Sequence, residues 1–113
     1  MLDKQEIIRR LNQYLPLLKQ KYPLNSIALF GSYARGEQQP GSDIDILVDF
    51  NQPVGMEIVD LAMELESILE RHIDIVTYNA IKDRLFYHIK DELAYAQAYD
   101  SLLSSRRDLV ALD

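Results

Sequence analysis

The sequence predicts one small α/β domain in which helices cover a short β-sheet. Apolar residues recur at helical spacing near the amino terminus and again over residues 55–70, and three short apolar runs fall outside these stretches. The chain has 113 residues, of which 48% are hydrophobic and 27% charged. This length suits one packed domain and is too short for two. We therefore expect a single domain over residues 1–113, with a core at about residues 5–95.

The first predicted helix begins near Asp3. Asp3 and Glu6 have the spacing of a capping box, in which each side chain accepts a hydrogen bond from a backbone amide near the helix start. The apolar stripe that follows consists of Ile7, Ile8, Leu11 and Leu15. Pro16 lacks an amide hydrogen, so it is expected to kink this helix or to begin a second short one.

Three apolar runs, 26–30, 43–50 and 73–77, predict strands. The first ends at Gly31, after which residues 32–36 suit one helical turn and 37–41 a loop. In the second run, apolar residues alternate with a set that includes Asp43, Asp45 and Asp49. One face of this strand is therefore expected in the core, and the other to carry carboxylates.

Two further helices are expected. Residues 55–70 carry a strong apolar stripe, with Glu57, Asp60 and Glu64 on a solvated face. Asn79 is a candidate cap for a last helix, whose shared apolar face consists of Ile81, Leu85 and Ile89. Residues 93–99 suit either an edge strand or more helix, and the tail 100–113 has no clear assignment.

Composition excludes several classes of protein. The formal net charge is −6, from 18 acidic and 12 basic residues, which disfavours binding to an extended nucleic acid. There is no cysteine, so disulfides and thiolate zinc sites are excluded. No run approaches the roughly 18 apolar residues of a membrane span, and the first residues lack an apolar signal core. We expect a soluble, cytoplasmic protein with no membrane partner.

Three acidic residues are candidates for a metal site. Asp43 and Asp45 are two residues apart in a strand, so their carboxylates project to the same side. Asp74 lies between Ile73 and Ile75 and joins them if the third strand lies beside the second. Carboxylates suit Mg²⁺, and two ions about 3.5–4 Å apart can clamp a phosphoryl-type transfer. The alternative is a set of solvent-facing acids at strand edges.

Gly31 and Ser32 are candidates for phosphate binding. Glycine allows the backbone to approach a ligand closely, and the amides and hydroxyl of the turn can donate to an anion. The alternative is an ordinary strand-to-helix turn. Arg35 suits either a phosphate contact or a structural role in the turn. Ser42 is expected to cap the turn before the aspartates, and Tyr33 is the one tyrosine that merits a functional test.

These residues lie in three motifs: Gly31-Ser32-Tyr33-Ala34-Arg35-Gly36, then Ser42-Asp43-Ile44-Asp45, then Ile73-Asp74-Ile75. Together they resemble the minimal nucleotidyltransferase (MNT) group of the DNA polymerase β-like nucleotidyltransferase superfamily. The resemblance implies a small mixed sheet covered mainly on one side by helices. It also implies that Asp43 and Asp45 ligate both Mg²⁺ ions. Asp74 would ligate the catalytic ion and help the acceptor hydroxyl to lose its proton.

The same resemblance implies that Gly31 and Ser32 hold the β and γ phosphates of ATP. Stand-alone MNT proteins resemble antitoxins that add AMP to a tyrosine of a partner HEPN-domain ribonuclease, with which they form a hetero-oligomer. This is the leading hypothesis for the chain. The alternatives are nucleotidyl transfer to a small molecule and a non-enzymatic antitoxin that covers the toxin's active site. His72 suits either a contact with the acceptor or a structural role at the strand edge, and His88 has no assigned role.

Overall fold

The computed structural model describes residues 2–81 and 83–97. Their elements are α1 (Lys4–Lys21), β1 (Leu24–Phe30), α2 (Gly31–Arg35), β2 (Ile44–Phe50), α3 (Glu57–Leu69), β3 (Ile73–Thr77), α4 (Asp83–Ile89), the 3-10 helix η1 (Lys90–Glu92) and β4 (Ala94–Tyr95). The predicted strands and helices are all present, most of them with bounds shifted by one to four residues. The tail 100–113 lies outside the described residues.

The four strands form one mixed sheet in the order β3-β2-β1-β4. Strand β1 is antiparallel to both β2 and β4, whereas β2 and β3 are parallel. A parallel neighbour requires a crossover connection, and α3 supplies it between β2 and β3. The register places Asp45 of β2 opposite Asp74 of β3.

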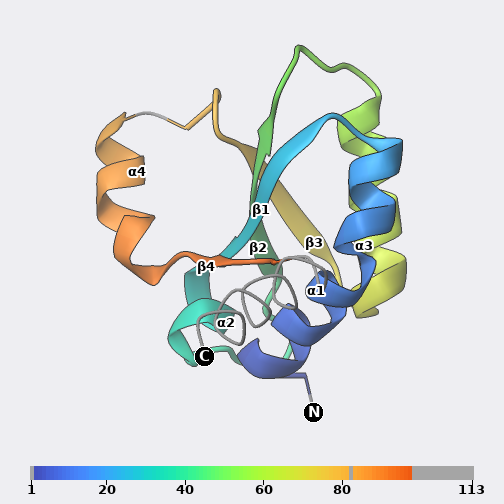
Figure 1. The fold of residues 1–113 in the computed structure, drawn as a ribbon. Coiled ribbons are helices and arrows are strands. Elements are labelled where there is room, and N and C mark those ends of the chain that lie inside the picture. The colour runs from blue at the N-terminus through green and yellow to red at the C-terminus, as the bar shows by residue number, and fades with distance from the viewer. Residues whose placement is uncertain (1, 82, 98–113) are drawn as a thin grey trace, which may run out of the picture.

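Helices α1 and α3 cover one face of the sheet, and α4 lies on the other side (Figure 1). The larger core cluster joins the two long helices to the strands, and its fully or almost fully buried members include Ile7, Leu11, Leu18, Leu61, Leu65, Leu69, Ile27, Leu29, Ile44, Ile46 and Val48. A smaller cluster under α4 consists of Ala28, Leu47, Ile81 and Ile89. The expectation of a small sheet covered mainly on one side is confirmed.

Helix α1 begins where the sequence predicted, because the Asp3 side chain accepts a hydrogen bond of 2.9 Å from the Glu6 amide. Glu6 does not complete the capping box, since its carboxylate binds Arg9 instead. The expected second helix at Pro16 is wrong: α1 is a single helix of 18 residues that contains this proline. Leu15 and Leu18 flank it on one buried face, and this packing outweighs one missing amide donor.

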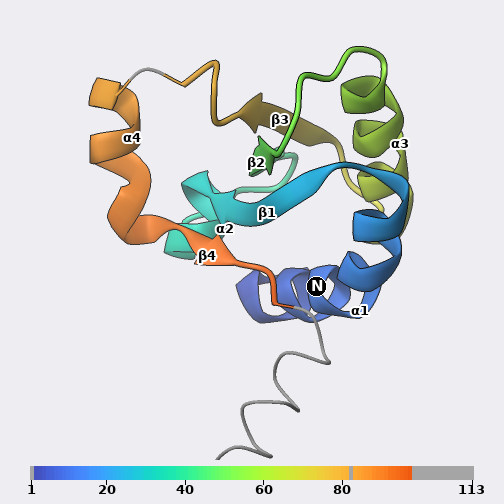
Figure 2. The same ribbon diagram turned by 45° about the horizontal axis from the view of Figure 1, so that its top comes forward.

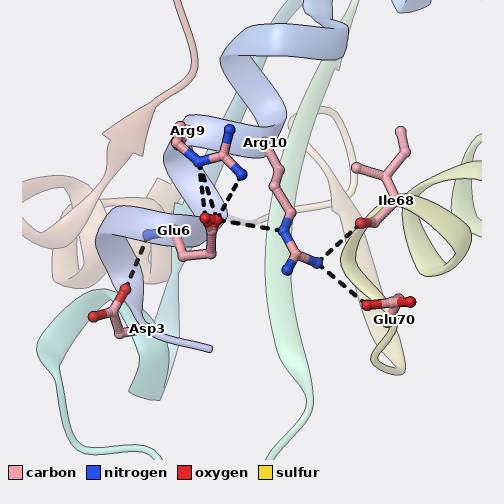
Figure 3. Close-up of polar contacts among 6 residues, drawn as sticks. All are labelled: Asp3, Glu6, Arg9, Arg10, Ile68 and Glu70. Carbon is pink, nitrogen blue, oxygen red and sulfur yellow. Dashed lines mark hydrogen bonds and ion pairs between the residues drawn. The ribbon is translucent and has the colours of Figure 1, made fainter. Parts of the chain in front are cut away.

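Arg10 of α1 ties this helix to the end of α3 (Figure 3). Its guanidinium donates to the Ile68 carbonyl at 3.2 Å and lies 3.7 Å from the Glu70 carboxylate and 3.5 Å from that of Glu6. Burial of the two apolar stripes and these polar contacts together fix α1 against α3. In residues 2–81 and 83–97, no helix is long and apolar enough to cross a membrane.

The segment after β3 departs most from expectation. Helix α4 begins at Asp83, so Asn79 is not its cap and lies in a turn instead. Ile81 and Ile89 are buried in one cluster as predicted, but Leu85 is half exposed. Of the two alternatives for residues 93–99, the edge strand is found at Ala94–Tyr95, where β4 pairs with β1 (Figure 2), and residues 98–99 lie outside the described residues.

Candidate active site

Two neighbouring parallel strands bring the candidate metal ligands together. Asp45 and Asp74 occupy paired positions of β2 and β3, so their side chains emerge from the same face of the sheet. This is the face that also carries Leu47 and lies opposite α1 and α3. Asp43 lies two residues before Asp45, directly ahead of β2. The condition attached to Asp74, that β3 lie beside β2, is met.

The electrostatics of Asp45 reflect this crowding. Burial raises the pKa of the Asp45 carboxyl above its ordinary value of 3.8, and the charges of Asp74 and Asp43 raise it further. The Arg35 guanidinium opposes the shift only in part. Like charges held close together favour protonation unless a cation neutralises them, so this region of the sheet is suited to a positively charged ligand.

The donor set fits a hard divalent cation. Carboxylate oxygens on adjacent strands are the ligands that Mg²⁺ prefers, together with water and phosphate oxygens. In the described part of the chain, no three acidic or imidazole side chains are gathered closely enough to hold a metal ion by themselves. A protein site for Mg²⁺ commonly has few carboxylates, with the remaining positions taken by substrate phosphates and water.

Gly31 faces the same carboxylate from the end of β1. A Cβ atom built at this position would lie 2.1 Å from Oδ2 of Asp45, and the residue has a positive φ of +76°. Both facts require glycine here, and they place the backbone of the turn directly against Asp45. Ser32 follows at once in α2. The Tyr33 side chain is only 4% exposed and packs in the large core cluster.

Glu92 completes the site and was missed by the sequence analysis. Its Oε2 atom accepts a hydrogen bond of 2.5 Å from the Gly31 amide and lies 3.0 Å from Nη1 of Arg35. Arg35 also donates from Nε to Glu37 at 3.1 Å. Sixty-one residues separate Glu92 from Gly31 along the chain, and no local pattern connects two residues so far apart.

Ser42 and His72 make contacts that stabilise loops next to the aspartates. The Ser42 hydroxyl accepts a hydrogen bond of 2.9 Å from the Gln39 amide, which confirms that Ser42 caps the turn before the aspartates. His72 Nδ1 lies 2.8 Å from Oε2 of Glu66, the same oxygen that accepts from the Ile73 amide. His72 therefore belongs to the connection between α3 and β3.

The fold is that of a nucleotidyltransferase. The family model described as "Nucleotidyltransferase domain" matches residues 11–99, and the chain belongs to that family. A predicted protein adenylyltransferase of Methanocaldococcus jannaschii is 44% identical over 77 residues, which cover 67% of this chain and 79% of that protein. The chain is accordingly a nucleotidyltransferase enzyme of the minimal type.

Solved structures agree with this assignment. The structure of a predicted minimal nucleotidyltransferase matches with a TM-score of 0.69 and 28% identity, covering 82% of this chain and 95% of that chain. A second match comes from the complex of a tri-AMPylated HEPN toxin of Shewanella oneidensis with an MNT antitoxin. Its TM-score is 0.60 and its identity 25%, and it covers 95% of this chain and 89% of that chain.

Proposed function

We propose that this chain transfers AMP from ATP to a hydroxyl group of a HEPN-family ribonuclease toxin and so acts as its antitoxin. The observation that carries the proposal is the pairing of Asp45 with Asp74 on adjacent parallel strands, directly beside Gly31. Carboxylates crowded in this way, next to a backbone turn that can approach an anion, suit a nucleotide with its divalent cations.

Each residue of the site has a role in this reaction. Asp43 and Asp45 would hold both Mg²⁺ ions, and Asp74 would hold the catalytic ion and help the acceptor hydroxyl to lose its proton. Bound Mg²⁺ would supply a more acidic acceptor hydroxyl and neutralise charge on the phosphates. Gly31, Ser32 and Arg35 would bind the β and γ phosphates. The acceptor oxygen then bonds to the α-phosphorus in line as the bond to pyrophosphate breaks.

The acceptor is proposed to be a tyrosine hydroxyl of the toxin. Support comes from similarity to a protein adenylyltransferase and to a chain from a complex in which the HEPN toxin carries three AMP groups. A net charge of −6 is also compatible with docking onto a basic, RNA-cutting partner. Transfer to a small molecule is less well supported, because the matching Methanocaldococcus jannaschii relative is described as a protein adenylyltransferase.

The test is to incubate the purified chain with ATP, Mg²⁺ and the protein encoded by the neighbouring gene, and to weigh both chains by intact-mass spectrometry. We expect the partner to gain mass in steps of one AMP, and this gain to disappear with the Asp43→Asn variant. Peptide mapping then identifies the modified residue. Binding and inhibition of the partner without any gain in mass would show a non-enzymatic antitoxin and overturn the proposal.

A further inference from the structure

One carboxylate occupies two of the three residues that are proposed to bind the nucleotide phosphates, Gly31 and Arg35. Glu92 accepts from the Gly31 amide at 2.5 Å, and both of its oxygens lie near Nη1 of Arg35, at 3.0 and 3.3 Å. Its side chain is only 19% exposed. Carboxylate and phosphate oxygens are interchangeable acceptors for backbone amides and guanidinium groups, so Glu92 makes the contacts that a phosphate group would make.

The charge of Glu92 also opposes the nucleotide. Glu92 is among the acidic groups that raise the pKa of Asp45, so its negative charge is felt at the centre of the site. A triphosphate brings several more negative charges to the same two donors. The single N–H of Gly31 has room for one strong acceptor at a time, and two adjacent anions repel each other. Glu92 and a phosphate therefore cannot both accept from the Gly31 amide, and at Arg35 their negative charges oppose each other.

We propose that Glu92 is an internal competitor of the nucleotide: its carboxylate occupies the phosphate donors when no nucleotide is bound and leaves them when the triphosphate enters. The proposal rests on the proposed function, because it takes Gly31 and Arg35 as phosphate donors. It adds a residue that sets the affinity for ATP. Until the triphosphate enters, Glu92 also gives the Gly31 amide a partner, since an unpaired donor in this half-buried turn would be costly.

The position of Glu92 allows its carboxylate to move away from Gly31 and Arg35. It is the last residue of η1, the short 3-10 helix that links α4 to β4. Among the described residues, the ladder between β1 and β4 consists of two pairs, Ala28 with Tyr95 and Leu29 with Ala94. A change of side-chain rotamer, or a small shift of η1, can release Gly31 and Arg35 without disturbing the core between the sheet and the two long helices.

The test compares Glu92→Gln with the wild-type chain. Glutamine keeps the size of the side chain and removes its charge, which weakens the contacts with Gly31 and Arg35. We expect ATP and inorganic tripolyphosphate to bind about tenfold more tightly to the variant, because a charge-assisted contact no longer competes. Adenosine, which has no phosphate, should bind with unchanged affinity. Isothermal titration calorimetry in the presence of Mg²⁺ measures all three ligands.

Two further variants separate contact from charge. Asp91→Asn removes one negative charge from the neighbouring position in η1. Among the described contacts no hydrogen bond joins Asp91 to Gly31 or Arg35. The affinities of this variant for ATP, tripolyphosphate and adenosine should therefore match those of the wild type. Glu92→Asp keeps the charge but shortens the reach by one methylene, so it should also bind ATP more tightly. Thermal unfolding by circular dichroism confirms that each variant is folded.

The outcomes distinguish this inference from the proposed function. Equal or weaker binding of ATP by Glu92→Gln, with AMP transfer intact in the wild type, would overturn the competitor role alone; a weaker affinity would make Glu92 a residue that positions Arg35. Tighter binding by the variant without AMP transfer by either protein would overturn the proposed function alone. Failure of every variant to bind ATP and tripolyphosphate would contradict both.

Discussion

Acidic residues on the two sides of the sheet have pKa values shifted in opposite directions. On the face covered by α1 and α3, Glu64 is hydrogen-bonded to Lys21 and Tyr22, and Glu6 is bonded to Arg9. These partners lower the pKa of both glutamates, chiefly through the hydrogen bonds from Lys21 and Arg9. On the other face, burial and the charges of Asp74 and Asp43 raise the pKa of Asp45.

This difference separates acids that stabilise the fold from acids that cost stability. A carboxylate whose pKa is lowered by folding stabilises the native state at neutral pH, whereas one whose pKa is raised destabilises it. The ion pairs of Glu6 and Glu64 therefore favour folding slightly at neutral pH, because pairs near the surface contribute little. The raised pKa of Asp45 has the opposite sign, as expected of a carboxylate suited to a positively charged ligand.

The largest predicted effect is that of Asp45→Asn. We expect AMP transfer to fall about a thousandfold, because several kcal/mol of charge stabilisation are lost with the ligand. In the presence of a chelator the same variant should be more stable than the wild type. Since folding raises the pKa of Asp45, the cost of its charge is absent at acid pH and appears as pH rises through that pKa, above 3.8.

The advantage in stability of Asp45→Asn should therefore increase with pH, and thermal unfolding with chelator from pH 3.5 to 7.5 measures it. Asp49→Asn is the matched control: it removes the same charge from β2, at a residue whose carboxylate is bonded only to the Asn25 amide among the described contacts. It should leave AMP transfer intact. A variant at Asp45 that retains near-normal turnover would refute the assignment of the metal site.

The second effect concerns the approach of the turn to this cluster. Gly31→Ala places a Cβ atom against Asp45 and strains a positive φ, so we expect about a hundredfold loss of AMP transfer, as for a displacement of about 1 Å in an active site. Gly36→Ala is the control, because Gly36 has a similar φ of +71° but open space around its Cβ position. Both should lose about 1–2 kcal/mol of stability to strain.

Activity at saturating ATP and the midpoint of thermal unfolding separate these two contributions. If Gly36→Ala impairs transfer as much as Gly31→Ala, backbone strain rather than contact with Asp45 controls the activity.

The smallest predicted effect is a loss of stability at Glu64, on the side of the sheet covered by α1 and α3. Glu64→Gln removes the ion pair with Lys21, which is half exposed, so we expect a loss of under about 1 kcal/mol at neutral pH. Folding lowers the pKa of Glu64, so its contribution is present above its ordinary value of 4.5 and disappears as pH falls below that value. Urea unfolding at pH 7 and pH 3 measures the difference, which should vanish at the lower pH. An equal difference at both values would show that Glu64 acts through packing and not through charge.

The sequence predicted most of the features that depend on local pattern. The bounds of β3 were predicted without error, because a run of β-branched residues ends at a turn on either side. The grouping of Asp45 with Asp74 followed from strand periodicity together with one topological condition. These features need only the alternation of side chains and the geometry of neighbouring strands.

The failures concern interactions between distant segments. Pro16 was expected to kink the first helix or to begin a second one, and the second helix is absent because α1 continues through it, packed on the sheet. The burial of the Tyr33 side chain in the core was not predicted from its place in the turn. Glu92 carried no signal, because its contacts arise only when β4 joins the sheet beside β1. Tertiary packing decides all three, and local sequence does not encode it.

The short pairing of β4 has a consequence for local opening of the native state. Hydrogen exchange reports such openings segment by segment, and segments with few hydrogen bonds open at a lower free energy than the whole molecule. Beyond this two-residue ladder, the described residues after β4 add a bond of 2.9 Å from the Ala96 amide to the Ile27 carbonyl and one of 2.7 Å from the Gln97 amide to Oδ1 of Asn12. This edge should exchange faster than the ladder between β1 and β2. The segment that carries Glu92 can then detach many times during the lifetime of one folded molecule.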